Sequence, residues 1–115
     1  MLGATIITIG GQERPLKFGT NATFLFCQKR GITLKQFGEV FAADKLANNE
    51  IDGSEIRDLI WAGLVAGAKS NNLPVDFDEW TVGDWIDDLS AADMGNVLST
   101  FGEDVPTKKK TVKGK

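Results

Sequence analysis

Six carboxylates gather in one segment of the chain, and side chains of this type bind calcium or transfer protons in other proteins. When an EF-hand loop is counted from the first of them, Thr81 stands where the turn needs glycine. Trp80 then occupies a ligand position, and an aspartate replaces the bidentate glutamate. We therefore interpret the carboxylates as a solvated acidic face and predict no metal site. They are Asp76, Asp78, Glu79, Asp84, Asp87 and Asp88.

Other groups that could perform catalysis are scarce. The chain has no His, no Tyr and a single cysteine, Cys27. Because no imidazole is available to activate this thiol, the sequence predicts a buried, inert cysteine rather than a nucleophile. A Ser–Lys dyad is the remaining alternative, but no motif marks one. The glycines match neither phosphate-binding nor dinucleotide-binding motifs. We therefore expect that the chain is not an enzyme and that it binds no cofactor and no small-molecule substrate.

The charges are unevenly distributed. Residues 1–105 carry 16 acidic and 8 basic residues, whereas the last eight residues contain five lysines. Such asymmetry is typical of proteins that work through macromolecular contacts. Nucleic acid is not the expected partner, because the acidic body repels phosphate and the tail has no aromatic residue for stacking. The composition of residues 103–115 predicts a disordered, basic tail.

The three tryptophans are candidates for partner binding. Trp61 lies in a strongly apolar stretch and is expected in the core. Trp80 and Trp85 lie in the acidic segment, where a large aromatic side chain is a possible interaction anchor. Core packing is the alternative for both.

The elements that must position these residues are a hairpin and several helices. The β-branched run Thr5–Ile9, followed by Gly10-Gly11, predicts a hairpin over 4–18, with Pro15 in an edge strand. Apolar periodicity predicts a mainly helical α+β fold, in which the hairpin packs on a bundle of about four to five helices within one domain, 1–102. The helices are expected near 20–30, 33–46, 54–69, 81–89 and 91–101, with caps at Thr20 or Asn21, then Thr33, Ser54, Thr81 and Ser90.

The helix over 54–69 should be the central core element, because its apolar stripe is broad and its other residues are small. No apolar run reaches the length of about 20 residues that a membrane span requires. The N-terminal residues do not resemble a signal peptide. Together with the lone cysteine, these features lead us to expect a soluble protein of a reducing cytoplasm.

Two motifs carry a family resemblance. Leu16-Lys17-Phe18-Gly19 leads from the hairpin into the first helix, and Leu59-Ile60-Trp61-Ala62-Gly63-Leu64 lies in the central helix. With the acidic helical end, this order of features resembles the tail assembly chaperones of long-tailed bacteriophages over roughly 5–101. The resemblance implies a non-enzymatic, self-associating factor of the host cell cytoplasm. It would coat the tape-measure protein, recruit tail-tube subunits and be absent from the finished particle.

The residues, taken together with this resemblance, give candidate roles to particular positions. Trp80, Trp85 and Phe101 are predicted anchors for helical segments of the tape-measure protein, and the hairpin edge is a predicted site of self-association. Many family members have a longer form made by ribosomal frameshifting, for which Lys108, Lys109 and Lys110 mark the possible position. Two alternatives remain open: a tail or neck completion protein retained in the virion, and a small enzyme or regulator.

Overall fold

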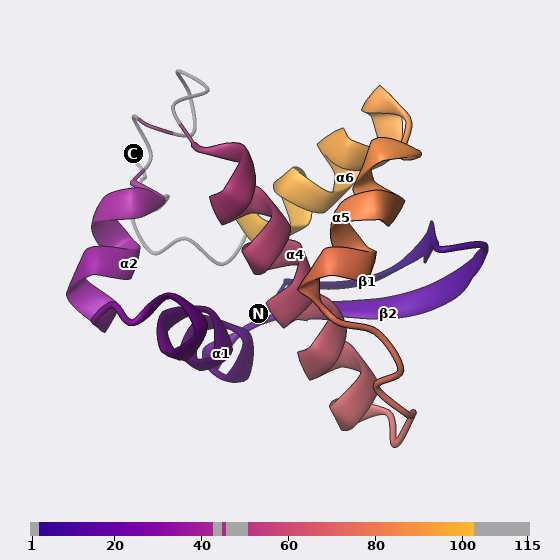
Figure 1. Ribbon diagram of the computed structural model, residues 1–115, viewed down its shortest axis with the longest axis horizontal. Helices are drawn as coiled ribbons and strands as arrows, with labels where there is room; N and C mark the ends of the chain where they lie inside the picture. Colours follow the sequence, from indigo (N-terminus) through magenta and orange to yellow (C-terminus); the bar gives the residue numbers. More distant parts are fainter. Residues whose placement is uncertain (1–2, 43–44, 46–50, 103–115) are drawn as a thin grey trace, which may run out of the picture.

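An N-terminal hairpin and the helices that follow it make up the fold in the computed structural model, which describes residues 3–42, 45 and 51–102. Within those residues lie one two-stranded antiparallel sheet and five helices, so the predicted α+β, mainly helical fold is confirmed (Figure 1). The predicted tail over 103–115 lies outside the described residues. The elements are β1 (Gly3–Ile9), β2 (Gln12–Phe18), α1 (Thr20–Arg30), α2 (Leu34–Val40), α4 (Gly53–Ser70), α5 (Glu79–Asp87) and α6 (Ala91–Gly102).

The hairpin turns at the predicted glycine pair. Gly10 and Gly11 have φ angles of 65° and 81°, and two consecutive positive values define the turn that matches the twist of a tight hairpin. This turn makes Ile9 and Gln12 a hydrogen-bonded pair, so every second pair after it is also bonded. Pro15 faces Ile6 in one of the intervening pairs, where a missing N–H costs the ladder nothing.

Helix α4 is the central, most buried element, as the sequence predicts, with ten buried residues. Its small residues allow β2 to approach closely. A Cβ on Gly63 would lie 2.5 Å from the Phe18 ring, and one on Gly67 would overlap the Pro15 carbonyl. Close contact between a helix and a strand excludes water from both backbones and from the side chains between them. Glycine at these two positions therefore sets how near the helix and hairpin can lie.

Five phenylalanines form an aromatic cluster that joins the hairpin to three helices. Phe101 of α6 lies 5.3 Å from Phe18 and 5.0 Å from Phe41 between ring centroids. Phe26 of α1 lies 5.4 Å from Phe37 of α2 and 5.2 Å from Phe41. Edge-to-face contacts of this kind stabilise a core beyond the area that they bury. The cluster is the main attachment of α2 to the rest of the molecule.

Two helices begin earlier than the sequence predicts. Asp52, not Ser54, caps α4, and its carboxylate accepts a hydrogen bond from the Ser54 N–H at 3.2 Å, while Glu55 accepts one from the Asp52 N–H at 2.9 Å. Asp78, not Thr81, caps α5 and accepts from the Thr81 N–H. In both cases an aspartate precedes the hydroxyl residue, and its carboxylate accepts from the free helical N–H groups.

The helix predicted over 33–46 is shorter than expected. Thr33 opens α2 as predicted, but the helix ends at Val40 and Phe41 is its C-cap; part of the remaining segment lies outside the described residues. The ring of Phe41 turns into the aromatic cluster instead of continuing the helical stripe. Helix α1 has Gly19 as its N-cap, without a side-chain bond, instead of Thr20 or Asn21. Ser90 caps α6 as predicted.

A buried ion pair fastens α1 to α4. Asp58 is buried, and its carboxylate accepts from the Arg30 guanidinium at 2.8 Å and from the Arg57 guanidinium at 3.1 Å. Asp58 lies beyond the first turn of α4, in which Glu55 is the acidic residue that the helix dipole favours. The Asp58 carboxylate is instead the acceptor that holds two helices together, and two arginines compensate its charge.

Candidate partner-binding site

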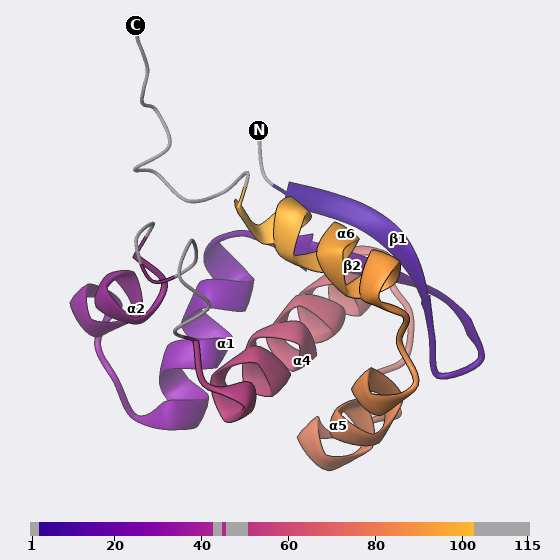
Figure 2. The ribbon, with the colours of Figure 1, turned by 90° about the horizontal axis from the view of Figure 1, so that it is seen from above.

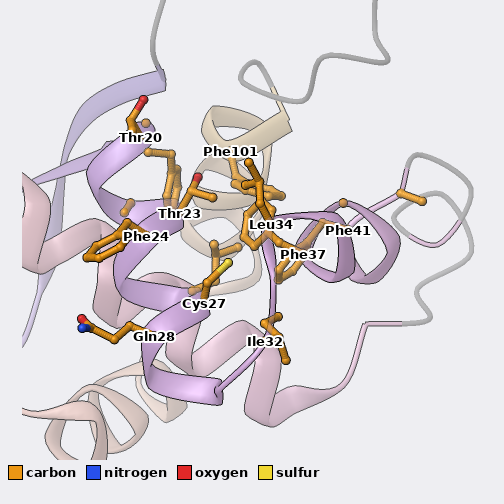
Figure 3. A pocket seen from close by; sticks show the side chains of 16 residues that line it. Thr20, Thr23, Phe24, Cys27, Gln28, Ile32, Leu34, Phe37, Phe41 and Phe101 are labelled. Carbon is orange, nitrogen blue, oxygen red and sulfur yellow. The ribbon is translucent and has the colours of Figure 1, made fainter.

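An open apolar groove of about 910 Å³ extends from the space between α1 and α2 over the outer surface of α1 (Figure 3). Its floor consists of aromatic rings from the phenylalanine cluster, and its walls come from α1 and α2. We call it the α1–α2 groove. It is lined by Phe18, Gly19, Thr20, Ala22, Thr23, Phe24, Cys27, Gln28, Ile32, Leu34, Phe37, Gly38, Phe41, Ala42, Leu59 and Phe101.

The groove exists because α2 is held away from α1 by a short, fixed connection. Gly31 ends α1 in the left-handed conformation, with a φ of 66°. Thr33 and Gln36 then form a capping box at the start of α2, with bonds of 3.1 and 2.9 Å. These local bonds set the direction in which α2 leaves. None of the α2 helix residues Leu34–Val40 is fully buried, so its inner side remains open towards the groove.

Two large apolar side chains lie exposed at the rim. Phe24 is 62% exposed and Leu34 is 70% exposed. A single exposed apolar side chain is ordinary, but two that line the same apolar groove are of the kind that marks interaction sites. Among the described residues that line the groove, none is charged. This arrangement suits an apolar partner surface.

Cys27 faces this groove rather than the core. The sequence predicts a buried thiol, whereas the structure shows it half-buried, with its Sγ donating to the Thr33 carbonyl at 3.7 Å. Partial burial raises the pKa of the Cys27 thiol, because a thiolate is poorly solvated there. A thiol held in its protonated form is a weak nucleophile. Its chemical contribution to the groove is therefore a small, weakly polar surface.

The three predicted anchors are not brought together. Phe101 is 4% exposed and contributes to the groove floor, so it is not the protruding anchor that the sequence suggests. Trp80 protrudes from α5 and is 73% exposed. Trp85 is half-buried, and neither tryptophan lines the groove. A partner role for the two tryptophans stays a prediction, and it would require a surface separate from the α1–α2 groove.

Trp85 helps to fasten the hairpin turn to α5. The Arg14 guanidinium lies 4.3 Å from the Trp85 ring and 5.4 Å from the Phe77 ring, and its Nε donates to the Ile9 carbonyl. A Cβ on Gly10 would overlap the Trp85 indole. Cation–π contacts and close packing of this type are stabilising. They favour the packing alternative for Trp85.

Two carboxylates of the acidic segment have structural roles. The Thr81 N–H bonds to Asp78, and the Lys29 ammonium lies 2.7 Å from Glu79. These contacts lower the pKa of both carboxyls, since they favour the charged forms. Within the described ranges 3–42, 45 and 51–102, no three metal-ligating side chains cluster. The remaining aspartates of the segment are exposed, in agreement with a solvated acidic face.

The groove residues Phe24 and Leu34 were not identified from the sequence. The available signal was the unbroken apolar run Phe24–Cys27, because four successive residues occupy most of a helix circumference. One side of such a helix must face away from the core.

Comparisons with protein-family models, curated proteins and solved structures find no match for this chain. In the part of the chain that the structure describes, no helix has the length and apolarity needed to cross a bilayer.

Proposed function

We propose that the chain is an assembly chaperone of long-tailed bacteriophage tails that holds helical segments of the tape-measure protein in the α1–α2 groove. The observation that carries the proposal is the groove itself, an apolar surface with exposed Phe24 and Leu34 at its rim. The tail-chaperone motifs described above supply the biological setting. In that setting the chaperone recruits tail-tube subunits in the host cell cytoplasm and leaves before the particle is complete.

An amphipathic helix is the client form that the groove suits best. Such helices place apolar side chains at intervals of three and four residues in an apolar channel. The lining has the aromatic floor and uncharged walls needed to receive them. An extended strand would need free backbone groups along the channel, and its walls are helices whose backbone groups are already bonded.

The charge of the body suits a chaperone. Residues 1–105 carry 16 acidic and 8 basic residues, so client complexes coated by the chain repel one another and stay dispersed. The binding surface is the α1–α2 groove, whose described lining residues are uncharged, so the repulsive acidic surface lies outside it. The same molecule would therefore shield apolar client residues and prevent the loaded complexes from aggregating.

Binding to tape-measure fragments tests the groove. Phe24→Ser and Leu34→Ser change exposed side chains, so both variants should stay folded. Each should weaken capture of a helical tape-measure fragment at least tenfold, as expected when a large apolar anchor of an interface is removed. Leu73→Ser is the control, because Leu73 is also exposed but does not line the groove. Equal capture by all three variants would place the client elsewhere, with Trp80 the next surface to examine.

Analysis of purified particles separates a chaperone from a retained tail or neck protein. The chaperone function requires that the chain be present in infected cells and missing from mature virions by mass spectrometry. A fixed number of copies per virion would establish the structural alternative instead. Lys108, Lys109 and Lys110, the predicted frameshift position, lie outside the described residues. Synonymous recoding of these lysines should abolish a longer product on an immunoblot.

A further inference from the structure

Strand β1 has a free edge. Among the residues that the structure describes, its only strand partner is β2, and no other backbone group bonds to it. Figure 2 shows β1 at the margin of the molecule, with β2 and α6 on its inner side and no helix beyond it. The edge of β2 is different, because Gly67 of α4 packs against the Pro15 carbonyl. The hairpin therefore has one covered edge and one open edge.

The turn geometry identifies the backbone groups at the open edge. Ile9, Ile7 and Thr5 belong to the hydrogen-bonded pairs of the hairpin, so their N–H and C=O groups point towards β2. The groups of Ala4, Ile6 and Thr8 consequently point outward. The same three residues are solvent-exposed, whereas Ile7 and Ile9 are buried. The exposed side chains and the unpaired backbone groups thus belong to one set of alternate residues.

This edge lacks the features that normally prevent strand pairing. Free edges are usually protected by charged residues, proline or bulges. Strand β1 reads Gly-Ala-Thr-Ile-Ile-Thr-Ile, without a charge or a proline, and pairs with β2 in continuous register. Ile6, at the middle of the edge, is 66% exposed. A sheet of two strands is also marginal on its own.

We propose that β1 pairs with β1 of a second copy of this chain, antiparallel and centred on Ile6, to form a continuous four-stranded sheet. In this register Ile6 faces Ile6 of the second copy, and Ala4 faces Thr8. All of these residues have outward-pointing backbone groups, so the three pairs exchange about six hydrogen bonds. Centring on Thr5 or Ile7 gives fewer bonded pairs within the strand. Pairing residues of opposite parity would turn buried side chains to solvent.

The edge favours a second copy because it is self-complementary. A two-fold axis through Ile6 relates each bonded group to its equivalent, as an isologous interface requires. No charged residue of β1 opposes a like charge across the axis. None of the residues that line the α1–α2 groove belongs to β1, so pairing leaves both grooves open. Pairing through β1 and binding in the groove can therefore be tested separately.

Light scattering on the full chain tests the pairing. The parent protein should have the mass of two chains at concentrations where Ile6→Lys has the mass of one, a twofold fall. Ile6→Pro should have the same effect, because it removes only an N–H that the hairpin does not use. Leu34→Lys, with its charge at an equally exposed apolar residue in the groove, should remain a dimer. A monomeric parent, or a dimer lost only in Leu34→Lys, would overturn the proposal.

Disulfide trapping tests the register. In a Cys27→Ser background, Ile6→Cys would place two cysteines about 5.5 Å apart between Cα atoms, within the range that a disulfide spans. Thr8→Cys would place them roughly 14 Å apart. Mild oxidation should therefore cross-link the first variant and not the second. If the two variants cross-link equally, or if a strand of another protein is required for pairing, the proposed homodimer is wrong.

Discussion

The contact between α4 and the hairpin and the α1–α2 groove are built from opposite kinds of residue. At the first, Gly63 and Gly67 let β2 lie directly against the helix, and the side chains around them are fully buried. At the second, aromatic rings form the floor of the groove, and Phe24 and Leu34 face solvent. Small residues lie at the closed contact, and large apolar residues line the open groove. Stability should therefore depend on the first region and partner binding on the second.

Placing the same charge in each region should give the largest contrast. Leu64→Asp puts an unpaired carboxylate into the closed region, where Leu64 is buried, and should cost more than about 4 kcal/mol of unfolding free energy. Leu34→Asp, at the groove rim, should cost less than about 0.5 kcal/mol. Thermal melts followed by circular dichroism measure both. If Leu64→Asp melted like the parent, α4 would not be the stabilising core.

Adding a single methyl group in each region should give a contrast of intermediate size, in which one variant loses stability and the other gains it. Gly67→Ala pushes a Cβ into the Pro15 carbonyl and should destabilise the protein by about 1–3 kcal/mol. Gly38→Ala, in α2, meets no atom within 4 Å and should stabilise it by about 0.5–1 kcal/mol. Urea denaturation reports the two free energies. Destabilisation of similar size in both variants would mean that the groove is as closely packed as the hairpin contact.

The ion pair between Lys29 of α1 and Glu79 of α5 should make the stability of the protein depend slightly on pH. Lys29 lowers the pKa of Glu79 below its ordinary value of 4.5. The folded protein therefore keeps this charge at lower pH than the unfolded chain does. The resulting stabilisation is complete above pH 4.5 and is lost as the pH falls through the folded-state pKa.

Melting temperatures measured between pH 7 and pH 3 should show this loss in the parent and less of it in Glu79→Gln. Asp84→Asn serves as the control, since Asp84 has no ion-pair partner within the described part of the chain. The difference should be small, because the Lys29 and Glu79 side chains are both partly exposed and solvent screens exposed pairs. An identical pH profile for Glu79→Gln and the parent would show that this ion pair does not help to hold α1.

Several features of the fold follow from local sequence. The Gly10-Gly11 turn, the placement of α4 and the start of α2 at Thr33 were all predicted correctly. Each depends on residues within a few positions of one another, through backbone conformation, helical period or capping. The capping errors at Ser54 and Thr81 are equally local, because in each case an aspartate and a hydroxyl residue competed for the same N–H groups.

The sequence by itself thus determined the turn, the central helix and its small-residue surface, because these depend on interactions between near neighbours. The tertiary structure alone decided that Phe101 lies in the core, that Phe24 faces solvent and that Asp58 is buried against Arg30. It likewise left the edge of β1 open while α4 covered β2. All of these depend on which elements lie side by side, and packing between distant residues follows from the three-dimensional fit of whole surfaces rather than from spacing along the chain.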